Sequence, residues 1–229
     1  MNIDLDGRTA LISGSSQGIG LAIATELARA GARVVLNGRS ASALDSAEEQ
    51  LLTEVPGARV IVVAADLATA EGVETLVAKV PVVDILVNNL GIFGAKPALD
   101  IDDDEWRRYF EVNVLSAIRL IRTYLPAMTD AGWGRIQNIC SDSAVVIPEE
   151  MIHYGMTKTA LLAVTRGFAK AAAGTGVTVN SVIVGPTHTE GVEKWGGPPP
   201  RGPPARGAGP PQKNKDPPPQ PPQPPPPDP

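Results

Sequence analysis

The chain has 229 residues, 43% of them hydrophobic, which is enough for one sizeable domain with a filled core. Its net charge of −5 argues against nucleic acid as a main partner, since phosphate binding needs a surplus of basic side chains. The first residues lack the basic and apolar segments of a secretory signal, and no apolar run reaches the ~18 residues that a membrane span needs. We therefore expect a cytoplasmic protein with no membrane partner.

The composition changes abruptly after Trp195. From residue 196 to 229 half of the residues are proline, and no apolar side chain is larger than alanine. Such a segment cannot bury enough surface to offset the entropy lost on ordering. We predict one folded domain over 1–195 and a disordered, proline-rich tail over 196–229.

The domain contains a single cysteine, Cys140, so an internal disulfide is excluded. Cys140 lies in an apolar run, which favours a buried thiol.

Short apolar runs alternate with amphipathic segments along the domain. The predicted strands are Thr9–Ser13, Arg33–Asn37, Val60–Ala64, Ile85–Asn88, Arg135–Cys140 and Val177–Val184. The predicted helices are Ile19–Ala30, Leu44–Glu54, Ala70–Lys79, a pair within Asp103–Met128, and Tyr154–Ala173. Alternating strands and helices imply parallel pairing with right-handed crossovers. The predicted fold is a single-domain α/β sandwich of three layers, with a doubly wound, Rossmann-like parallel β-sheet in the middle.

A glycine-rich turn joins the first predicted strand to the first predicted helix. Glycine permits positive φ and lets the backbone approach a pyrophosphate, while the helix N-terminus offers free N–H groups to its charge. A plain tight turn has the same composition, but this position favours nucleotide binding. The predicted cofactor contacts here are Gly14, Ser16, Gln17, Gly18, Ile19 and Gly20.

The segment Asn37–Ser40 follows the second strand and bears on the choice of cofactor. An NAD enzyme usually places a carboxylate here for the adenosine ribose, whereas a 2′-phosphate calls for a guanidinium. This chain has Arg39 and no carboxylate before Asp45. NADP(H) is therefore preferred, with NAD(H) as the alternative if Arg39 is an ordinary solvated loop residue.

Two later strand ends carry further candidate cofactor contacts. Asp66 and Leu67 follow the third strand, where an acidic side chain could contact the adenine amino group or cap the next helix. Asn89 and Gly91 follow the fourth strand. An asparagine there can tie neighbouring strand ends together and a glycine allows close cofactor approach, although a plain turn also fits.

Tyr154 and Lys158 are one helical turn apart, on the same face of a predicted helix. A phenol with a pKa of about 10 is a poor acid or base at neutral pH, but a nearby ammonium stabilises its anion and lowers that pKa. Such a pair is commonly just a partly exposed helix face. Its position after the fifth strand of a nucleotide-binding sheet favours catalysis.

Two more polar residues are candidates for the same site. Ser141 ends the fifth strand, where its hydroxyl could hold a carbonyl oxygen within reach of Tyr154. Asn113 is unfavourable inside a helix, which indicates a role in the site, such as a water-linked proton path from Lys158. Four neighbouring residues border the expected substrate side, where we interpret them as solvated loop positions: Asp142, Glu149, Glu150 and His153. Because His153 directly precedes Tyr154, its ring should point away from the tyrosine side chain.

In order and spacing, these motifs resemble those of the short-chain dehydrogenase/reductase family over residues 5–195. They are Gly14-x-x-x-Gly18-x-Gly20, Asn88-Asn89-Leu90-Gly91, Asn113, Ser141, Tyr154-x-x-x-Lys158, and Asn180 with Gly185–Thr189. The resemblance implies that Ser141 orients the substrate and Tyr154 is the general acid and base. It also implies that Lys158 tunes Tyr154 and holds the ribose, and that Asn113 supports a proton relay. Further implied cofactor contacts are Pro186, Thr187 and Thr189.

The implied reaction is hydride transfer between the nicotinamide of NADP(H) or NAD(H) and a small-molecule ketone or secondary alcohol, with no metal. The resemblance also implies a homodimer or homotetramer. One internal departure is Leu90, in place of the usual alanine. A leucine there could crowd the cofactor or fill an adjacent gap, and we expect the change to be tolerated.

The end of the chain departs further, because the family normally continues with helices and a last strand where this chain has its proline-rich tail. We expect the strand Val177–Val184 to be an unpaired edge, and a frameshift is one hypothesis for the tail. Two alternative functions follow. The chain could be an inactive or weakly active family member, or a nucleotide-binding interaction protein whose Pro217–Pro227 segment docks as a polyproline II helix.

Overall fold

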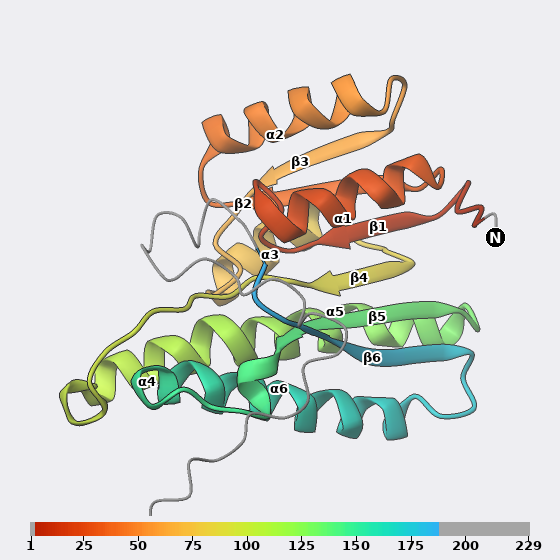
Figure 1. Cartoon of the computed structure of the whole chain (residues 1–229). Coiled ribbons are helices and arrows are strands. Elements are labelled where there is room, and N and C mark those ends of the chain that lie inside the picture. The colour runs from red at the N-terminus through yellow and green to blue at the C-terminus, as the bar shows by residue number, and fades with distance from the viewer. Residues whose placement is uncertain (1–2, 188–229) are drawn as a thin grey trace, which may run out of the picture.

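The computed structural model describes residues 3–187, which form a six-stranded parallel sheet in the order β3-β2-β1-β4-β5-β6 (Figure 1). The strands are β1 (Thr9–Ile12), β2 (Arg33–Gly38), β3 (Val60–Ala64), β4 (Ile85–Asn88), β5 (Gly134–Ser141) and β6 (Val177–Val184). The order reverses between β1 and β4, as in a doubly wound sheet, and it places a ligand crevice at the carboxyl ends of these strands. The predicted fold class is confirmed.

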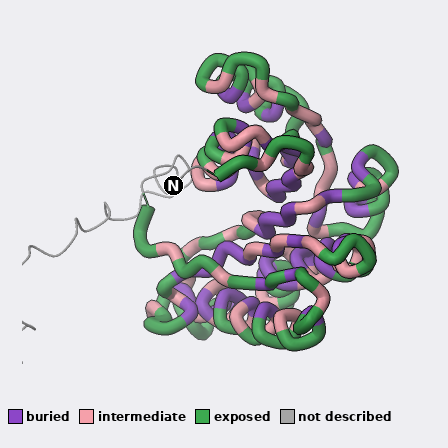
Figure 2. Tube along the Cα trace, turned by 90° about the vertical axis from the view of Figure 1, so that its right-hand side faces the viewer, coloured by how far each residue is buried: buried purple, intermediate pink, exposed green. Residues whose placement is uncertain are grey.

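Helices cover both faces of the sheet and bury its apolar strands. They are α1 (Gly18–Arg29), α2 (Ala41–Glu54), α3 (Ala70–Lys79), α4 (Asp103–Phe110), α5 (Ser116–Asp130) and α6 (Ile152–Ala171). Helices α1 and α2 pack on one face, and α3, α5 and α6 pack on the other. Figure 2 shows the buried residues concentrated between these layers. Parallel strands buried on both faces need continuous apolar runs, which is what the sequence supplies.

Two differences from the predicted helices have local causes. Helix α2 begins at Ala41 because the Ser40 hydroxyl accepts a hydrogen bond from the backbone N–H of Ala43 (3.3 Å) and so caps the helix. The predicted pair within Asp103–Met128 is confirmed as α4 and α5, joined by a π-helical turn, Glu111–Leu115. Such a turn widens the helix by one residue and is often found at functional sites.

Strand β6 is at the edge of the sheet that residues 3–187 form, as expected. Its side chains Val182 and Ile183 are 44% and 51% exposed, so apolar surface is open along this edge. The predicted domain end at residue 195 and the tail lie outside the described residues. Within the described range, no helix has both the length and the apolar character needed to cross a membrane.

Candidate active site

A cavity of about 200 Å³ lies at the carboxyl edge of the sheet and brings the two ends of the predicted site together. The glycine turn forms one side, and Tyr154 and Lys158 of α6 form the other. Asn89, Gly91 and Val184 line it between them. Residues far apart in the sequence thus share one crevice.

The glycine turn has a backbone that larger residues would disrupt. Gly14 and Gly18 adopt positive φ, +64° and +57°. A Cβ at Gly20 would overlap the Gly14 carbonyl oxygen and lie 2.6 Å from Asn89 Nδ2. Glycine is therefore needed for the turn and for close packing of α1 against β4. The N-terminus of α1 has no side-chain cap on Gln17, which leaves its N–H groups for an anion.

Asparagine side chains hold the neighbouring strand ends in place, as expected for Asn89. Its amide donates hydrogen bonds to the carbonyl oxygens of Ser13 (3.1 Å) and Gly14 (2.8 Å), joining β4 to the glycine turn. Asn37 does the same on the other side: its amide donates to the carbonyl oxygens of Val63 and Ala65, both at 3.1 Å. Side-chain hydrogen bonds of Asn37 and Asn89 therefore fix the strand ends beneath the crevice.

Arg39 is exposed directly after β2, close to the glycine turn. The preceding Gly38 lies against Ser16, with its virtual Cβ 3.3 Å from the Ser16 hydroxyl oxygen. The backbone N–H of Ser15 also donates to the carbonyl oxygen of Asn37 (2.8 Å). This packing holds the segment that carries Arg39 beside the glycine turn.

After β3, the backbone of Leu67 stays a candidate cofactor contact, whereas the capping alternative for Asp66 needs correction. The Leu67 side chain is 1% exposed and belongs to the hydrophobic core, so only its backbone is available to a cofactor. The cap of α3 is Thr69, whose hydroxyl accepts from the N–H of Gly72 (3.0 Å), and not Asp66. Asp66 instead accepts from the N–H of Ala68 (3.1 Å), which closes a tight turn.

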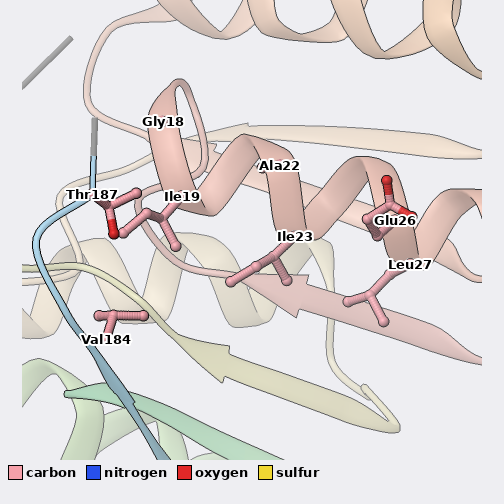
Figure 3. A pocket seen from close by; sticks show the side chains of 8 residues that line it. All are labelled: Gly18, Ile19, Ala22, Ile23, Glu26, Leu27, Val184 and Thr187. Carbon is pink, nitrogen blue, oxygen red and sulfur yellow. The ribbon is translucent and has the colours of Figure 1, made fainter. Parts of the chain in front are cut away.

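Pro186 and Thr187 are exposed and follow β6 toward the start of α1. Thr187 lines an apolar hollow of about 570 Å³ together with Gly18, Ile19 and Val184, and Figure 3 shows it beside Ile19. The described chain thus returns to the glycine turn at this point. Thr189, the third implied contact of this segment, lies outside the described residues.

Asn113 sits in the π-helical turn and is 1% exposed. Its Oδ1 accepts from the N–H of Ile92 (2.7 Å), and its amide donates to the Ile92 carbonyl (2.9 Å) and to the Thr157 hydroxyl (3.0 Å). Thr157 in turn donates to the Tyr154 carbonyl (2.7 Å). The Asn113 side chain therefore joins the segment after β4 to the first turn of α6.

Lys158 is 5% exposed, and its ammonium donates to the carbonyl oxygen of Ile139 at 2.8 Å. Burial lowers the pKa of Lys158 to about 8, because the charged form loses its hydration. The ammonium lies 5.7 Å from the centroid of the Tyr154 ring. Lys158 therefore lies beside Tyr154 on the same side of the cavity.

The Tyr154 pKa differs from the sequence prediction. Burial raises the pKa of this phenol, a hydrogen bond with the Ser141 side chain lowers it, and the negative charge of Asp142 raises it again. The net direction is upward. The expected lowering by Lys158 is therefore wrong for this geometry, because desolvation of the phenolate outweighs the favourable groups.

His153 was expected to be solvated, and this is wrong. Its side chain is fully buried, with the ring centroid 4.0 Å from that of Tyr109, and Nε2 is 3.7 Å from the Glu105 carboxylate. Neither ring nitrogen has a hydrogen-bond partner among the described residues. Consecutive helix residues point in different directions, so Tyr154 faces the cavity while His153 packs on α4. The other three positions, Asp142, Glu149 and Glu150, are exposed as expected.

The buried imidazole predicts a pH dependence of stability. Burial lowers the pKa of His153, although Glu105 raises it and Lys96 lowers it further. The unfolded chain therefore takes up the proton first, and stability is lost as the pH falls below about 6.5. Urea unfolding at pH 7.5 and 5.0 should show a smaller loss for His153→Phe than for the wild type, because phenylalanine keeps the ring but cannot be protonated. Equal losses in both proteins contradict this prediction.

Comparison with known proteins identifies the family of this chain. A family model described as short chain dehydrogenase matches residues 8–197. The chain belongs to the short-chain dehydrogenase family. Uncharacterized oxidoreductase YvaG of Bacillus subtilis is 48% identical over 193 residues, which cover 84% of this chain and 73% of that protein. D-beta-hydroxybutyrate dehydrogenase of Rhizobium meliloti is 36% identical over 191 residues, covering 82% and 74%.

A solved structure gives the same result. L-sorbose reductase from Gluconobacter frateurii, complexed with NADPH and L-sorbose, superimposes with a TM-score of 0.80 at 36% identity, covering 83% of this chain and 73% of that chain. This short-chain dehydrogenase is therefore an NAD(P)-dependent oxidoreductase for CH–OH and C=O groups. The glycine turn fits a dinucleotide, because its positive-φ glycines Gly14 and Gly18 bring the backbone to the start of α1, where no side chain caps the N–H groups.

Sequence reasoning missed three residues that position the site. Thr157 connects Asn113 to the first turn of α6, and the Ser13 hydroxyl accepts from the N–H groups of Asn89 and Leu90, both at 3.0 Å. His153 anchors the same turn of α6 to α4. A polar residue at the end of an apolar run was the available signal for Ser13, whereas no sequence pattern marks Thr157. Leu90, in contrast, is partly buried and packs against the hydrophobic core.

Proposed function

We propose that this short-chain dehydrogenase transfers hydride between NADP(H) and a ketone or secondary alcohol, with Tyr154 as the general acid and base. The observation that carries the proposal is the single cavity in which Tyr154 and Lys158 face the glycine turn. A nucleotide held at the turn would extend into the cavity that Tyr154 and Lys158 line. The relatives named D-beta-hydroxybutyrate dehydrogenase and L-sorbose reductase support a hydroxyl and carbonyl substrate pair.

In the reductive direction, Tyr154 gives its proton to the carbonyl oxygen as its O–H bond breaks, and the product is the alcohol. The bound dihydronicotinamide would supply the hydride to the carbonyl carbon. The Lys158 ammonium stabilises the phenolate that is left, and Ser141 is close enough to hydrogen-bond the phenol. Oxidation reverses both transfers. Asn113 acts by holding the Ile92 segment and Thr157 in place.

The remaining cofactor contacts are proposed from their positions. In the turn they are Gly14, Ser16, Gln17, Gly18, Ile19 and Gly20, and at the other strand ends Arg39, Asp66, the Leu67 backbone, Asn89, Gly91, Pro186 and Thr187. A homodimer or homotetramer and a cytoplasmic location stay predictions. Sedimentation velocity tests the oligomeric state.

A substrate screen tests the proposed function. The full chain is incubated with NADPH or NADH and a panel of ketones, and with NADP⁺ or NAD⁺ and the matching alcohols, while absorbance at the nicotinamide band is recorded. We expect NADPH-dependent reduction of at least one ketone. Cofactor binding with no turnover on any ketone or alcohol contradicts the proposal and favours an interaction protein.

Arg39 is expected to select NADPH over NADH. A guanidinium hydrogen bond to a phosphate contributes about 1.5–3 kcal/mol, so Arg39→Ala should weaken NADPH binding by about 10- to 100-fold and leave NADH unchanged. Arg33→Ala is the matched control, since Arg33 is exposed at the opposite end of β2. Fluorescence titration with both cofactors gives the dissociation constants. Equal weakening of NADH and NADPH by Arg39→Ala contradicts the role.

A further inference from the structure

Phe93 places an aromatic ring in the active-site cavity beside Tyr154. It lines the same cavity, and the residue is 37% exposed. The two rings meet edge-on, with their centroids 6.2 Å apart and their planes inclined at 61°. A carbonyl oxygen that accepts the Tyr154 proton must lie within hydrogen-bond distance of the phenol. Substituents on that carbonyl carbon therefore come within reach of the Phe93 ring.

The position of Phe93 relative to Tyr154 is set by one buried side chain, Asn113. The N–H of the preceding residue, Ile92, donates to Asn113 Oδ1 at 2.7 Å, and the Ile92 carbonyl accepts from the Asn113 amide at 2.9 Å. The same amide donates to the Thr157 hydroxyl (3.0 Å), which donates to the Tyr154 carbonyl (2.7 Å). The aromatic ring and the phenol thus belong to one hydrogen-bonded unit, so the ring needs little ordering when a substrate binds.

A second segment adds apolar surface next to the tyrosine. Three consecutive side chains that follow β5 are 69%, 76% and 44% exposed: Val145, Val146 and Ile147. Ile147 packs against the backbone of Gly155, because a Cβ there would lie 2.7 Å from Ile147 Cγ2. Large apolar side chains that are exposed together commonly mark a binding surface. The segment after β5 therefore presents an apolar side chain next to the turn of α6 that carries Tyr154.

The charges of the segments after β4 and β5 favour a neutral ligand. These segments comprise residues 91–100 and 142–151, and the N–H of Lys96 joins them by donating to the Glu150 carbonyl at 2.8 Å. Lys96 is the one cation in the two segments, and its ammonium is paired with Glu105. Three exposed carboxylates lie on the segment after β5: Asp142, Glu149 and Glu150. An anionic substituent that extends over this segment would meet like charges.

We propose that Phe93 is a specificity-determining residue that binds an apolar substituent of the substrate, so that the substrate is a neutral ketone or secondary alcohol with an alkyl or aryl chain. The proposal rests on the proposed function of Tyr154. Contact with the ring removes apolar surface of the chain from water, which is favourable in proportion to the area covered. A sugar or a hydroxy acid would instead lose hydration of its hydroxyl or carboxylate groups against the ring.

A series of methyl ketones whose alkyl chain grows from ethyl to hexyl tests the proposal. In the wild type, kcat/KM should rise by up to about fourfold for each added methylene. Levulinate, a methyl ketone that ends in a carboxylate, should have a kcat/KM at least about tenfold below that of the butyl ketone. Phe93→Ala should lower kcat/KM for the hexyl ketone by about 5- to 20-fold and leave the ethyl ketone within about twofold of the wild type.

Two further variants separate specificity from a structural role. Phe93→Leu keeps an apolar side chain and should retain the dependence on chain length. Phe110→Ala is the matched control, because Phe110 is a phenylalanine of equal exposure, 36%, at the end of α4 and outside the cavity lining, and it should leave the series unchanged. An equal loss for every ketone in Phe93→Ala overturns the proposal, as does a wild-type series with no dependence on chain length.

Binding gives a readout that needs no turnover, since NADP⁺ and a ketone are both oxidised and cannot react with each other. Ligand-observed NMR in the presence of NADP⁺ should show that the hexyl ketone binds at least about tenfold more tightly than the ethyl ketone, and Phe93→Ala should reduce this difference. Equal affinity for the two ketones, or no binding of either, overturns the proposal. If the hexyl ketone binds as expected but NADPH reduces no ketone, the proposed function fails and the site for an apolar chain stands.

Discussion

Tyr154→Phe is expected to lower kcat/KM for ketone reduction by about 10²- to 10⁴-fold, the usual contribution of a positioned general acid. The substitution removes only the hydroxyl. The ring stays to pack edge-on against Phe93, with the centroids 6.2 Å apart, so cofactor binding and folding should be unchanged. Steady-state rates with saturating NADPH, with NADPH titration and urea unfolding alongside, measure the three quantities separately.

Tyr124→Phe is the matched control for this loss. Tyr124 is also a buried tyrosine, and its hydroxyl donates to the Val80 carbonyl at 2.8 Å, far from the cavity. Its removal should lower the free energy of unfolding by about 1 kcal/mol and leave kcat unchanged. A Tyr154→Phe enzyme with wild-type kcat, or a Tyr124→Phe enzyme with the same loss, contradicts the assignment of Tyr154 as the acid.

The cofactor end of the site could be predicted from the sequence because its requirements are local. Glycine is the residue type that adopts positive φ most readily, so the conformation of Gly14 and Gly18 could be predicted from the sequence. The position of the turn after β1 places it at the ligand crevice. The same holds for Asn89, whose strand-end position implied the hydrogen bonds to Ser13 and Gly14 that the structure has. Parallel strands bring such ends together, so the shared crevice followed from the order of the elements.

The electrostatics of the catalytic end could not be predicted, because they depend on burial by distant elements. The spacing of Tyr154 and Lys158 placed both side chains on the same side of the cavity, as predicted. The pKa of each is nevertheless set mainly by desolvation on burial. His153 shows the same limit: a histidine after a polar loop resembles a solvated residue until α4 packs against it. The burial of the Leu67 side chain likewise could not be predicted, because it depends on whether the turn after β3 faces the core or the crevice.

Gly20→Ala is expected to damage both the fold and the cofactor site, because the added methyl has no room. It would overlap the Gly14 carbonyl oxygen and lie 2.6 Å from Asn89 Nδ2 and 2.9 Å from Ser15 Cα. Two of these atoms belong to the backbone, so the glycine turn itself must move. Overpacking of this kind costs about 1–3 kcal/mol of unfolding free energy. The displaced turn also loses its alignment with a pyrophosphate, and we expect NADPH affinity to fall by more than about tenfold.

Gly167→Ala separates this steric effect from a general effect of adding a methyl group to a helix. Gly167 is an exposed glycine inside α6, and a Cβ there would meet nothing within 4 Å. Alanine should therefore stabilise that helix by up to about 1 kcal/mol and leave NADPH binding unchanged. If the glycine turn holds the cofactor, urea unfolding gives changes of opposite sign in the two variants, and NADPH titration shows weaker binding in Gly20→Ala alone. If Gly20→Ala binds NADPH with wild-type affinity, the pyrophosphate lies elsewhere, because no backbone N–H of a displaced turn could hold it in the same way.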